Sequence, residues 1–303
     1  MEKQTHLVVH TSVFEADAGG GNPAPVVLSA THLSKEQMRQ VAAAFGAETA
    51  FVLDPVQQDA DVQFRFFVPT HEMEMCVHDT IGAVTVLVDR KRLVKSPVRI
   101  ETLSGTISVE WTPSEGGIDI TVEQFVPAFS PTNPSLEEVA AALRIPQTAV
   151  RLDWGPLQSV STARAKLMVP LEDYQLLDGL QPDFEALWQV CDTYEATGFY
   201  PFTLHTRSRA LQVEARQFPK RAGYNEDPAT GTAACALGAY LTEHHVLQNA
   251  FEGWHTYCIG QGYAMGHPSI LVAEIFVERR KMTKTRMKGK ASIKGEETIE
   301  LMV

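Results

Sequence analysis

The stretch Cys76-Val77-His78-Asp79-Thr80-Ile81-Gly82-Ala83 leads from polar and ionisable side chains into a run of apolar residues. The run predicts an apolar helix over Thr80–Asp89. The later stretch Asp227-Pro228-Ala229-Thr230-Gly231-Thr232-Ala233-Ala234 has the same character, and a helix of small residues is predicted from Thr230 to about His245. The two junctions indicate a weak internal duplication, in which each half of the chain passes from a polar loop into an apolar helix.

The segments that precede the two junctions also resemble each other. Ser34 is followed three residues later by Gln37, and Ser135 by Glu138. This is the spacing of a capping box at the start of a helix. Gly46 suits the left-handed position that ends the first of these helices. Each half is therefore expected to begin with a capped amphipathic helix.

Prolines mark the expected boundary between the halves. Pro127, Pro131 and Pro134 follow one another within eight residues, which is typical of a linker. We predict an N-terminal domain over residues 1–126 and a C-terminal domain over residues 127–303. The C-terminal tail is expected to pack on either one.

The composition favours small-molecule chemistry over binding to nucleic acid or membrane. The chain has 26 Lys and Arg and 37 Asp and Glu, so its net charge is 26 − 37 = −11. An acidic protein is a poor partner for a phosphate backbone. No stretch approaches the roughly 20 apolar residues of a membrane helix, and the first residues lack the apolar core of a signal peptide. We expect a cytoplasmic protein with neither partner.

The cysteines and the basic tail have simple interpretations. No two of the four cysteines form a CxxC pair, so we predict reduced thiols rather than disulfides or a zinc site; they are Cys76, Cys191, Cys235 and Cys258. From Arg279 to Lys294 there are eight Lys or Arg residues and no acids. This segment lacks interleaved aromatic residues for base stacking, so we predict a solvated edge strand.

The two junctions are suited to binding a carboxylate. The first N–H groups of a helix have no partner within it, and the helix dipole makes them partly positive. A carboxylate ligand can dock there, and Gly231 and Thr232 allow close approach to the backbone. Pro228 suits the first turn because its missing N–H costs nothing. The alternative for Asp227 is that it only caps its helix.

Glu48 and His78 are candidates for proton transfer. Glu48 begins an apolar strand, where a carboxyl group beside Phe51 and Val52 would lose water and have a raised pKa. The alternative is an exposed glutamate at the end of the strand. His78 titrates nearest to neutral pH. No HExxH, GxGxxG, GxxxxGK[ST] or GxSxG motif occurs, so we predict no catalytic metal, dinucleotide site, P-loop or nucleophile elbow.

Taken together and in order, six stretches resemble the phenazine-biosynthesis PhzF-like isomerase family over nearly the whole chain. Each is weak alone, but the shared order is specific. The stretches are Gly21-Asn22-Pro23-Ala24-Pro25-Val26-Val27, Ala47-Glu48-Thr49-Ala50-Phe51-Val52, Phe66-Phe67-Val68-Pro69-Thr70, the His78 segment, Glu226-Asp227-Pro228-Ala229-Thr230-Gly231-Thr232-Ala233 and Gly260-Gln261-Gly262-Tyr263-Ala264-Met265-Gly266-His267-Pro268-Ser269.

The resemblance implies a fold and a class of reaction. The fold would be mixed α/β (α+β) and similar to diaminopimelate epimerase, with two pseudo-symmetric domains, each a curled, mostly antiparallel sheet around a central helix. The family works without a cofactor and is commonly dimeric. We therefore expect a homodimeric isomerase that moves a proton on a small carboxylate-bearing substrate and uses no cofactor.

The same resemblance assigns the site residues. Glu48 matches the family's acid/base glutamate, and His78 and Asp227 match its other two catalytic residues. The amides of Gly231 and Thr232 would receive the substrate carboxylate. Substrate contacts are also expected at two neighbours of His78, which are Asp79 and Thr80.

Two departures from the family pattern leave alternatives open. The family usually has Gly-His-Pro around the histidine, whereas this chain has Val77-His78-Asp79. One alternative is a binding protein without activity on the same fold. Another is a racemase or epimerase that uses Cys76, although the position of a second cysteine in such enzymes is occupied here by Asp227.

Overall fold

The computed structural model describes residues 3–247 and 252–302, which form two compact units. The first unit comprises Met1–Glu15, Gly21–Glu123 and Lys288–Val303, and the second comprises Ala16–Gly20 and Gln124–Met287. The predicted boundary at 126/127 lies three residues from the passage into the second unit at Gln124, and the short segment Ala16–Gly20 also belongs to the second unit. The C-terminal tail, which was expected on either domain, belongs to the first.

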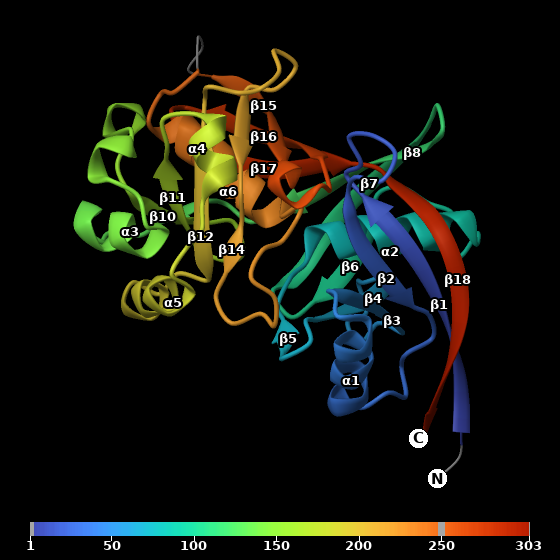
Figure 1. The fold of residues 1–303 in the computed structure, drawn as a ribbon. Coiled ribbons are helices and arrows are strands. Elements are labelled where there is room, and N and C mark those ends of the chain that lie inside the picture. The colour runs from blue at the N-terminus through green and yellow to red at the C-terminus, as the bar shows by residue number, and fades with distance from the viewer. Residues whose placement is uncertain (1–2, 248–251, 303) are drawn as a thin grey trace. The chain divides into compact units, whose positions relative to one another are not determined.

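A mostly antiparallel sheet forms the framework of the first unit (Figure 1). β1 pairs antiparallel with both β18 and β2, β2 pairs parallel with β3, and β3 pairs antiparallel with β4. β4 adjoins β5 and, in parallel, β6, which continues into the antiparallel strands β7 and β8. The strands are β1 (Lys3–Val13), β2 (Asn22–Val27), β3 (Thr49–Leu53), β4 (Val62–Phe67), β5 (Glu72–Met73), β6 (Val98–Thr102), β7 (Gly105–Ser114), β8 (Gly117–Gln124) and β18 (Ala291–Met302).

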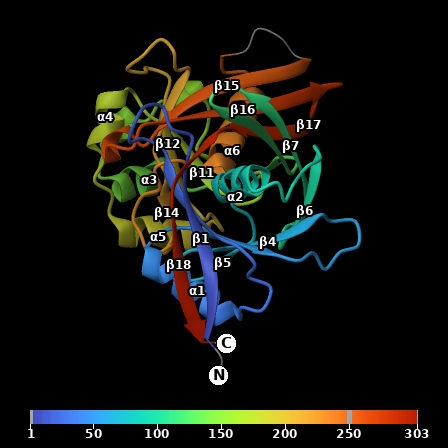
Figure 2. The same ribbon diagram turned by 90° about the vertical axis from the view of Figure 1, so that its right-hand side faces the viewer.

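Helices cover both faces of this sheet. The central helix α2 (Val77–Asp89) contacts β1, β2, β3 and β18. Figure 2 shows α2 next to β1 and β18. The helix comes so close that a Cβ on Gly82 would lie 2.5 Å from the Thr11 hydroxyl. Helix α1 (Lys35–Phe45) packs instead on a cluster that includes Val8 and Val27. Because successive side chains of a strand point to opposite faces, α1 and α2 lie on opposite sides of β1 and β2.

Helix α2 begins earlier than predicted. The predicted helix Thr80–Asp89 starts three residues too late, because the observed helix begins at Val77 with Cys76 at the N-cap. The Thr80 N–H donates to the Cys76 carbonyl oxygen, which closes the first turn. An acidic side chain in the first turn is favourable beside the positive end of the helix dipole. His78 and Asp79 therefore lie in the first turn rather than in a loop.

The second unit repeats this plan. Its strands pair in the order β9, β10, β11, β12, β13, β15, β16, with β14 also beside β12; the β11–β12 and β13–β15 pairs are parallel and the other pairs in this order are antiparallel. They are β9 (Ala128–Phe129), β10 (Gln158–Ser161), β11 (Lys166–Pro170), β12 (Gly198–Thr203), β13 (Val213–Ala215), β14 (Phe218–Pro219), β15 (Gly253–Gln261) and β16 (Ser269–Glu278); β17 (Lys281–Gly289) follows.

The buried helix α6 (Gly231–Glu243) packs against β10, β11, β15 and β16. A separate apolar cluster joins β11 and β12 to the remaining helices of this unit. Those helices are α3 (Leu136–Leu143), α4 (Tyr174–Gly179) and α5 (Phe184–Thr193). The described residues of this unit also form short 3₁₀ helices at Gln147–Ala149, Leu152–Trp154 and Tyr263–Met265. The predicted arrangement of a curled sheet around a central helix in each half is confirmed.

The two predicted capping boxes are also confirmed. The Ser34 hydroxyl accepts a hydrogen bond from the Gln37 N–H at the start of α1. At the start of α3 the Ser135 hydroxyl accepts one from the Glu138 N–H. Gly46 ends α1 in the left-handed conformation with φ 63°. These local signals depend on a few neighbouring residues, so they can be recognised without tertiary information.

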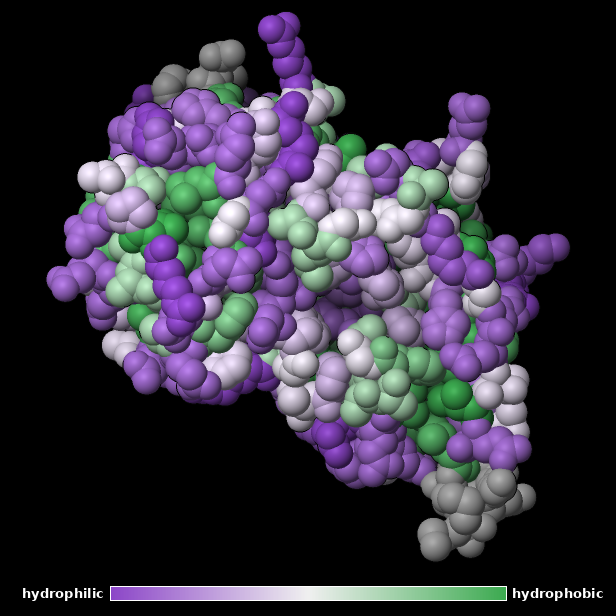
Figure 3. All heavy atoms as spheres, in the orientation of Figure 1, coloured by the Kyte–Doolittle hydropathy of each residue, from purple (hydrophilic) through white to green (hydrophobic). Residues whose placement is uncertain are grey.

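Hydrophilic residues cover much of the surface seen in Figure 3, with smaller apolar patches between them. Among the exposed apolar side chains are Val56 and Val94, which are 78% and 79% exposed. Among the described residues, no helix combines the length and the apolar character needed to span a membrane.

A buried arginine fastens the segment that leads to α6. Arg216 donates from Nε and Nη2 to the two carboxylate oxygens of Glu226, at 2.8 and 2.7 Å. Its Nη1 donates to the carbonyl oxygens of Leu177, Asp178 and Leu180 at the end of α4. Removing one partner of a buried pair leaves the other charge without compensation.

We expect Arg216→Ala to lower the free energy of unfolding by about 3–5 kcal/mol, measured by urea unfolding followed by circular dichroism. The control is Arg144→Ala in the same unit, since Arg144 forms an exposed pair with Asp183. That change is expected to cost less than about 1 kcal/mol. Equal unfolding midpoints for the two variants would contradict the stabilising role of the buried pair.

Candidate active site

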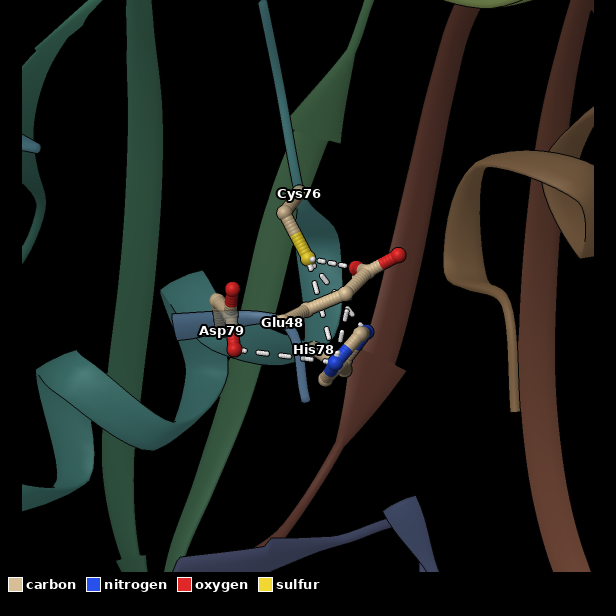
Figure 4. A group of neighbouring side chains, drawn as sticks. All are labelled: Glu48, Cys76, His78 and Asp79. Atoms are coloured by element: carbon tan, nitrogen blue, oxygen red, sulfur yellow. Dashed lines mark hydrogen bonds and ion pairs between the residues drawn. The ribbon is translucent and has the colours of Figure 1, made fainter. Parts of the chain in front are cut away.

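Four ionisable side chains of the first unit converge at the start of α2 (Figure 4). Glu48 lies between α1 and β3, because the left-handed Gly46 ends the helix and the buried strand begins at Thr49. The other three side chains come from the N-cap and first turn of α2, and they are Cys76, His78 and Asp79. A turn after one helix and the start of another thus bring together residues about thirty positions apart.

The contacts within this cluster centre on Glu48 and His78. The Cys76 thiol donates a hydrogen bond to Glu48 Oε2 at 3.0 Å, and its sulfur lies 3.3 Å from His78 Nδ1. His78 Nε2 lies 3.6 Å from Glu48 Oε2 and 3.6 Å from Asp79 Oδ1. The Glu48 carboxylate therefore touches both a thiol and an imidazole.

Burial distinguishes Glu48 from the other members. The Glu48 side chain is 12% exposed, whereas His78 and Asp79 are 2% and 0% exposed. Cys76 is 4% exposed. Of the four groups, the Glu48 carboxyl is the one with the most access to a molecule that approaches from solvent.

Burial also determines the protonation of the thiol and the imidazole. The pKa of the Cys76 thiol is raised well above its usual value, first by burial and then by the charges of Asp79 and Glu48. The pKa of His78 is lowered by burial, and the nearby Glu48 carboxylate partly offsets this. At neutral pH the cluster therefore combines a protonated thiol with a neutral imidazole.

The remaining predicted residue of this segment is also buried. Thr80 is fully buried, and its hydroxyl donates to the Cys76 carbonyl oxygen at 2.6 Å. This bond reinforces the first turn of α2. The expected contacts of Asp79 and Thr80 with a substrate stay predictions.

The second unit holds the other predicted residues at the start of α6. The helix begins at Gly231, and Thr230 occupies the N-cap without a side-chain capping bond. Asp227 lies before the helix, where its carboxylate accepts a hydrogen bond from the Thr230 hydroxyl. The alternative that Asp227 is the N-cap of α6 is therefore wrong, and so is the placement of Pro228 in the first turn.

Gln261 organises this segment, and the sequence did not identify it as a positioning residue. Its Nε2 donates to the Asp227 carbonyl oxygen at 2.7 Å, while its Oε1 accepts from the Tyr200 hydroxyl at 2.8 Å and from the Thr230 N–H. The side chains of Gln261, Tyr200 and Asp227 are buried, and Thr230 is half-buried. Burial, followed by the charge of Asp227, raises the pKa of Tyr200 well above its usual value, so Tyr200 stays a hydrogen-bond donor. The feature of the sequence that points to Gln261 is its position within the Gly260–Ser269 motif.

Comparison with known proteins agrees with this architecture. The family model "Phenazine biosynthesis-like protein" (PhzC-PhzF) matches residues 11–296. Isomerase YddE of Escherichia coli O157:H7 is 31% identical over 290 residues, covering 94% of this chain and 95% of its own. The trans-2,3-dihydro-3-hydroxyanthranilate isomerase of Pseudomonas chlororaphis is 27% identical over 302 residues, covering 98% and 100%.

A solved structure extends the likeness to the fold. The crystal structure of a Bacillus anthracis phenazine biosynthesis protein of the PhzF family superposes with a TM-score of 0.87. Its sequence identity is 27%, and the match covers 99% of this chain and 100% of that one. The chain therefore belongs to the phenazine biosynthesis-like family and is an isomerase of that family.

Proposed function

We propose that this isomerase moves a proton between two carbon atoms of a small carboxylate-bearing metabolite, with Glu48 as the group that takes and returns the proton. The observation that supports this most directly is the position of the Glu48 carboxyl. It is the most exposed member of a buried cluster and contacts both the Cys76 thiol and His78. A general base must reach its substrate, and the more buried neighbours can tune it.

The proposed proton transfer balances without a cofactor. The Glu48 carboxylate accepts a proton from one carbon and becomes a carboxylic acid, while the electron pair of the broken C–H bond delocalises into the conjugated substrate. Glu48 then donates the proton to a second carbon and becomes a carboxylate again. No electrons leave the substrate, so neither an oxidant nor a reductant is required.

The neighbours of Glu48 have distinct proposed roles. The Cys76 thiol donates a hydrogen bond to Oε2 and is proposed to hold the Glu48 carboxylate in position. His78 is proposed to hold a polar group of the substrate and to assist the transfer as a neutral imidazole.

The second unit is proposed to bind the polar parts of the substrate. The first N–H groups of α6, at Gly231 and Thr232, would accept the carboxylate, as helix N-termini do for anions. The missing capping bond from the Thr230 side chain supports this assignment. Asp227 is proposed to bind a second polar group. The cytoplasmic location, the homodimer and the absence of nucleic-acid and membrane partners stay predictions.

A racemase that uses Cys76 is the second candidate, favoured by the 3.0 Å contact between the thiol and Glu48. In that case the thiol would donate or accept the substrate proton itself. Its lower exposure and raised pKa make Cys76 a poorer proton-transfer group than Glu48.

The role of Glu48 is tested by deuterium exchange. Wild-type protein incubated in D2O with a library of small carboxylic acids should replace substrate C–H by C–D, measured by NMR or mass spectrometry. Glu48→Gln should lower the exchange rate by about 10²–10⁴-fold, since the amide cannot accept the proton. Glu74→Gln, at an exposed glutamate of the same unit, is the control and should exchange normally. Undiminished exchange by Glu48→Gln would exclude the proposed role, and binding without exchange by wild type would indicate a binding protein.

The role of Cys76 is tested by its conservative replacement. Cys76→Ser keeps a hydrogen-bond donor beside Glu48, so the exchange rate should fall by no more than about tenfold. A tenfold change corresponds to the net free energy of about one hydrogen bond. Cys76→Ala removes the donor and should lower the rate further. If Cys76→Ser is as inactive as Glu48→Gln, or if wild type inverts a stereocentre of its substrate, the thiol is a proton-transfer group.

A further inference from the structure

The cluster of Glu48, Cys76, His78 and Asp79 also offers a complete set of ligands for a metal ion. One donor atom from each residue lies within 4.8 Å of every other. A thiolate sulfur, an imidazole nitrogen and carboxylate oxygens are the ligand types that Zn²⁺ takes in proteins, with four ligands in a tetrahedral site. The sequence pattern did not predict such a site, because Glu48 is 28 residues from Cys76.

The spacing of the donor atoms fits a zinc tetrahedron. Bond lengths of about 2.3 Å to sulfur and about 2.0–2.1 Å to nitrogen or oxygen place tetrahedral ligands roughly 3.3–3.5 Å apart. His78 Nε2 lies 3.6 Å from both the Glu48 and Asp79 oxygens and 3.9 Å from the Cys76 sulfur. The Cys76 sulfur lies 3.0 Å from Glu48 Oε2. These four donor–donor distances are within about 0.5 Å of the tetrahedral spacing, and all the donor atoms lie within 4.8 Å of one another.

The four ligands are positioned by a buried helix and a buried strand. Three of the ligands lie on the N-cap and first turn of α2, a helix that is buried from Val77 to Leu87. The fourth precedes β3, all of whose residues are buried.

We propose that Glu48, Cys76, His78 and Asp79 bind one Zn²⁺ ion, and that the bound ion inhibits the isomerase. Binding forms a sulfur–zinc bond and releases the thiol proton of Cys76 to solvent, with no change in oxidation state. A Glu48 carboxylate that ligates zinc cannot take a proton from a substrate. The inhibition rests on the proposed function of Glu48, whereas the binding of the ion does not.

The test of binding uses Co²⁺ as an optical probe of the metal-free protein. Tetrahedral binding with a thiolate ligand should produce intense visible bands and a sulfur-to-cobalt charge-transfer band in the near ultraviolet, saturating at one equivalent. Zn²⁺ should displace the cobalt and remove both the visible bands and the charge-transfer band. Cys76→Ser should abolish the charge-transfer band, and the control Cys258→Ser, at a half-buried thiol of the other unit, should retain it.

A second variant keeps the site testable if Cys76→Ser unfolds. Asp79→Asn should weaken Co²⁺ binding by more than about tenfold, since even residues that only orient a ligand change metal affinity about 10–100-fold. Thermal unfolding of each variant checks that it is folded. A titration without a charge-transfer band, or a band that survives Cys76→Ser, overturns the site.

The inhibition is measured separately by deuterium exchange. One equivalent of Zn²⁺ should stop the exchange by wild type, and a chelator should restore it. Undiminished exchange with zinc bound overturns the inhibition. If the metal-free protein catalyses no exchange on any acid, the proposed function fails, and the cobalt spectrum still decides whether the metal site exists.

Discussion

The burial of α2 against its sheet is the constraint on which the rest of the first unit depends. Every residue from Val77 to Leu87 is buried, and Gly82 allows the helix to approach Thr11 on β1 closely. A helix held in this way cannot move its N-terminus away from β3. Cys76, His78 and Asp79 are therefore fixed next to Glu48, and ionisable groups that would otherwise be hydrated are kept in a region of low dielectric.

The same packing determines the chemistry of the site. Low access to water keeps the Cys76 thiol protonated and His78 neutral, so the two side chains in contact with Glu48 act as uncharged polar groups at neutral pH. Buried side chains also fix the start of α6 in the second unit. There the buried side chains of Gln261 and Tyr200, together with the half-buried Thr230, form a hydrogen-bond network that holds Asp227 before the helix.

Local signals in the sequence were sufficient for part of this structure. The Ser34 and Ser135 capping boxes and the turn at Gly46 were predicted because each depends on adjacent residues. The first turn of α2 was missed, because polar residues in a buried first turn resemble a loop when only the sequence is considered. The contact between Cys76 and Glu48 and the role of Gln261 depend on tertiary packing, which no local pattern encodes.

A crystal structure with a substrate or a substrate-like carboxylic acid bound tests the role of Glu48 most directly. We expect a Glu48 carboxylate oxygen about 3–3.5 Å from the carbon that loses its proton, with Cys76 behind Glu48 and out of contact with the ligand. A ligand whose reacting carbon faces the Cys76 sulfur, or is separated from Glu48 by another side chain, would contradict it.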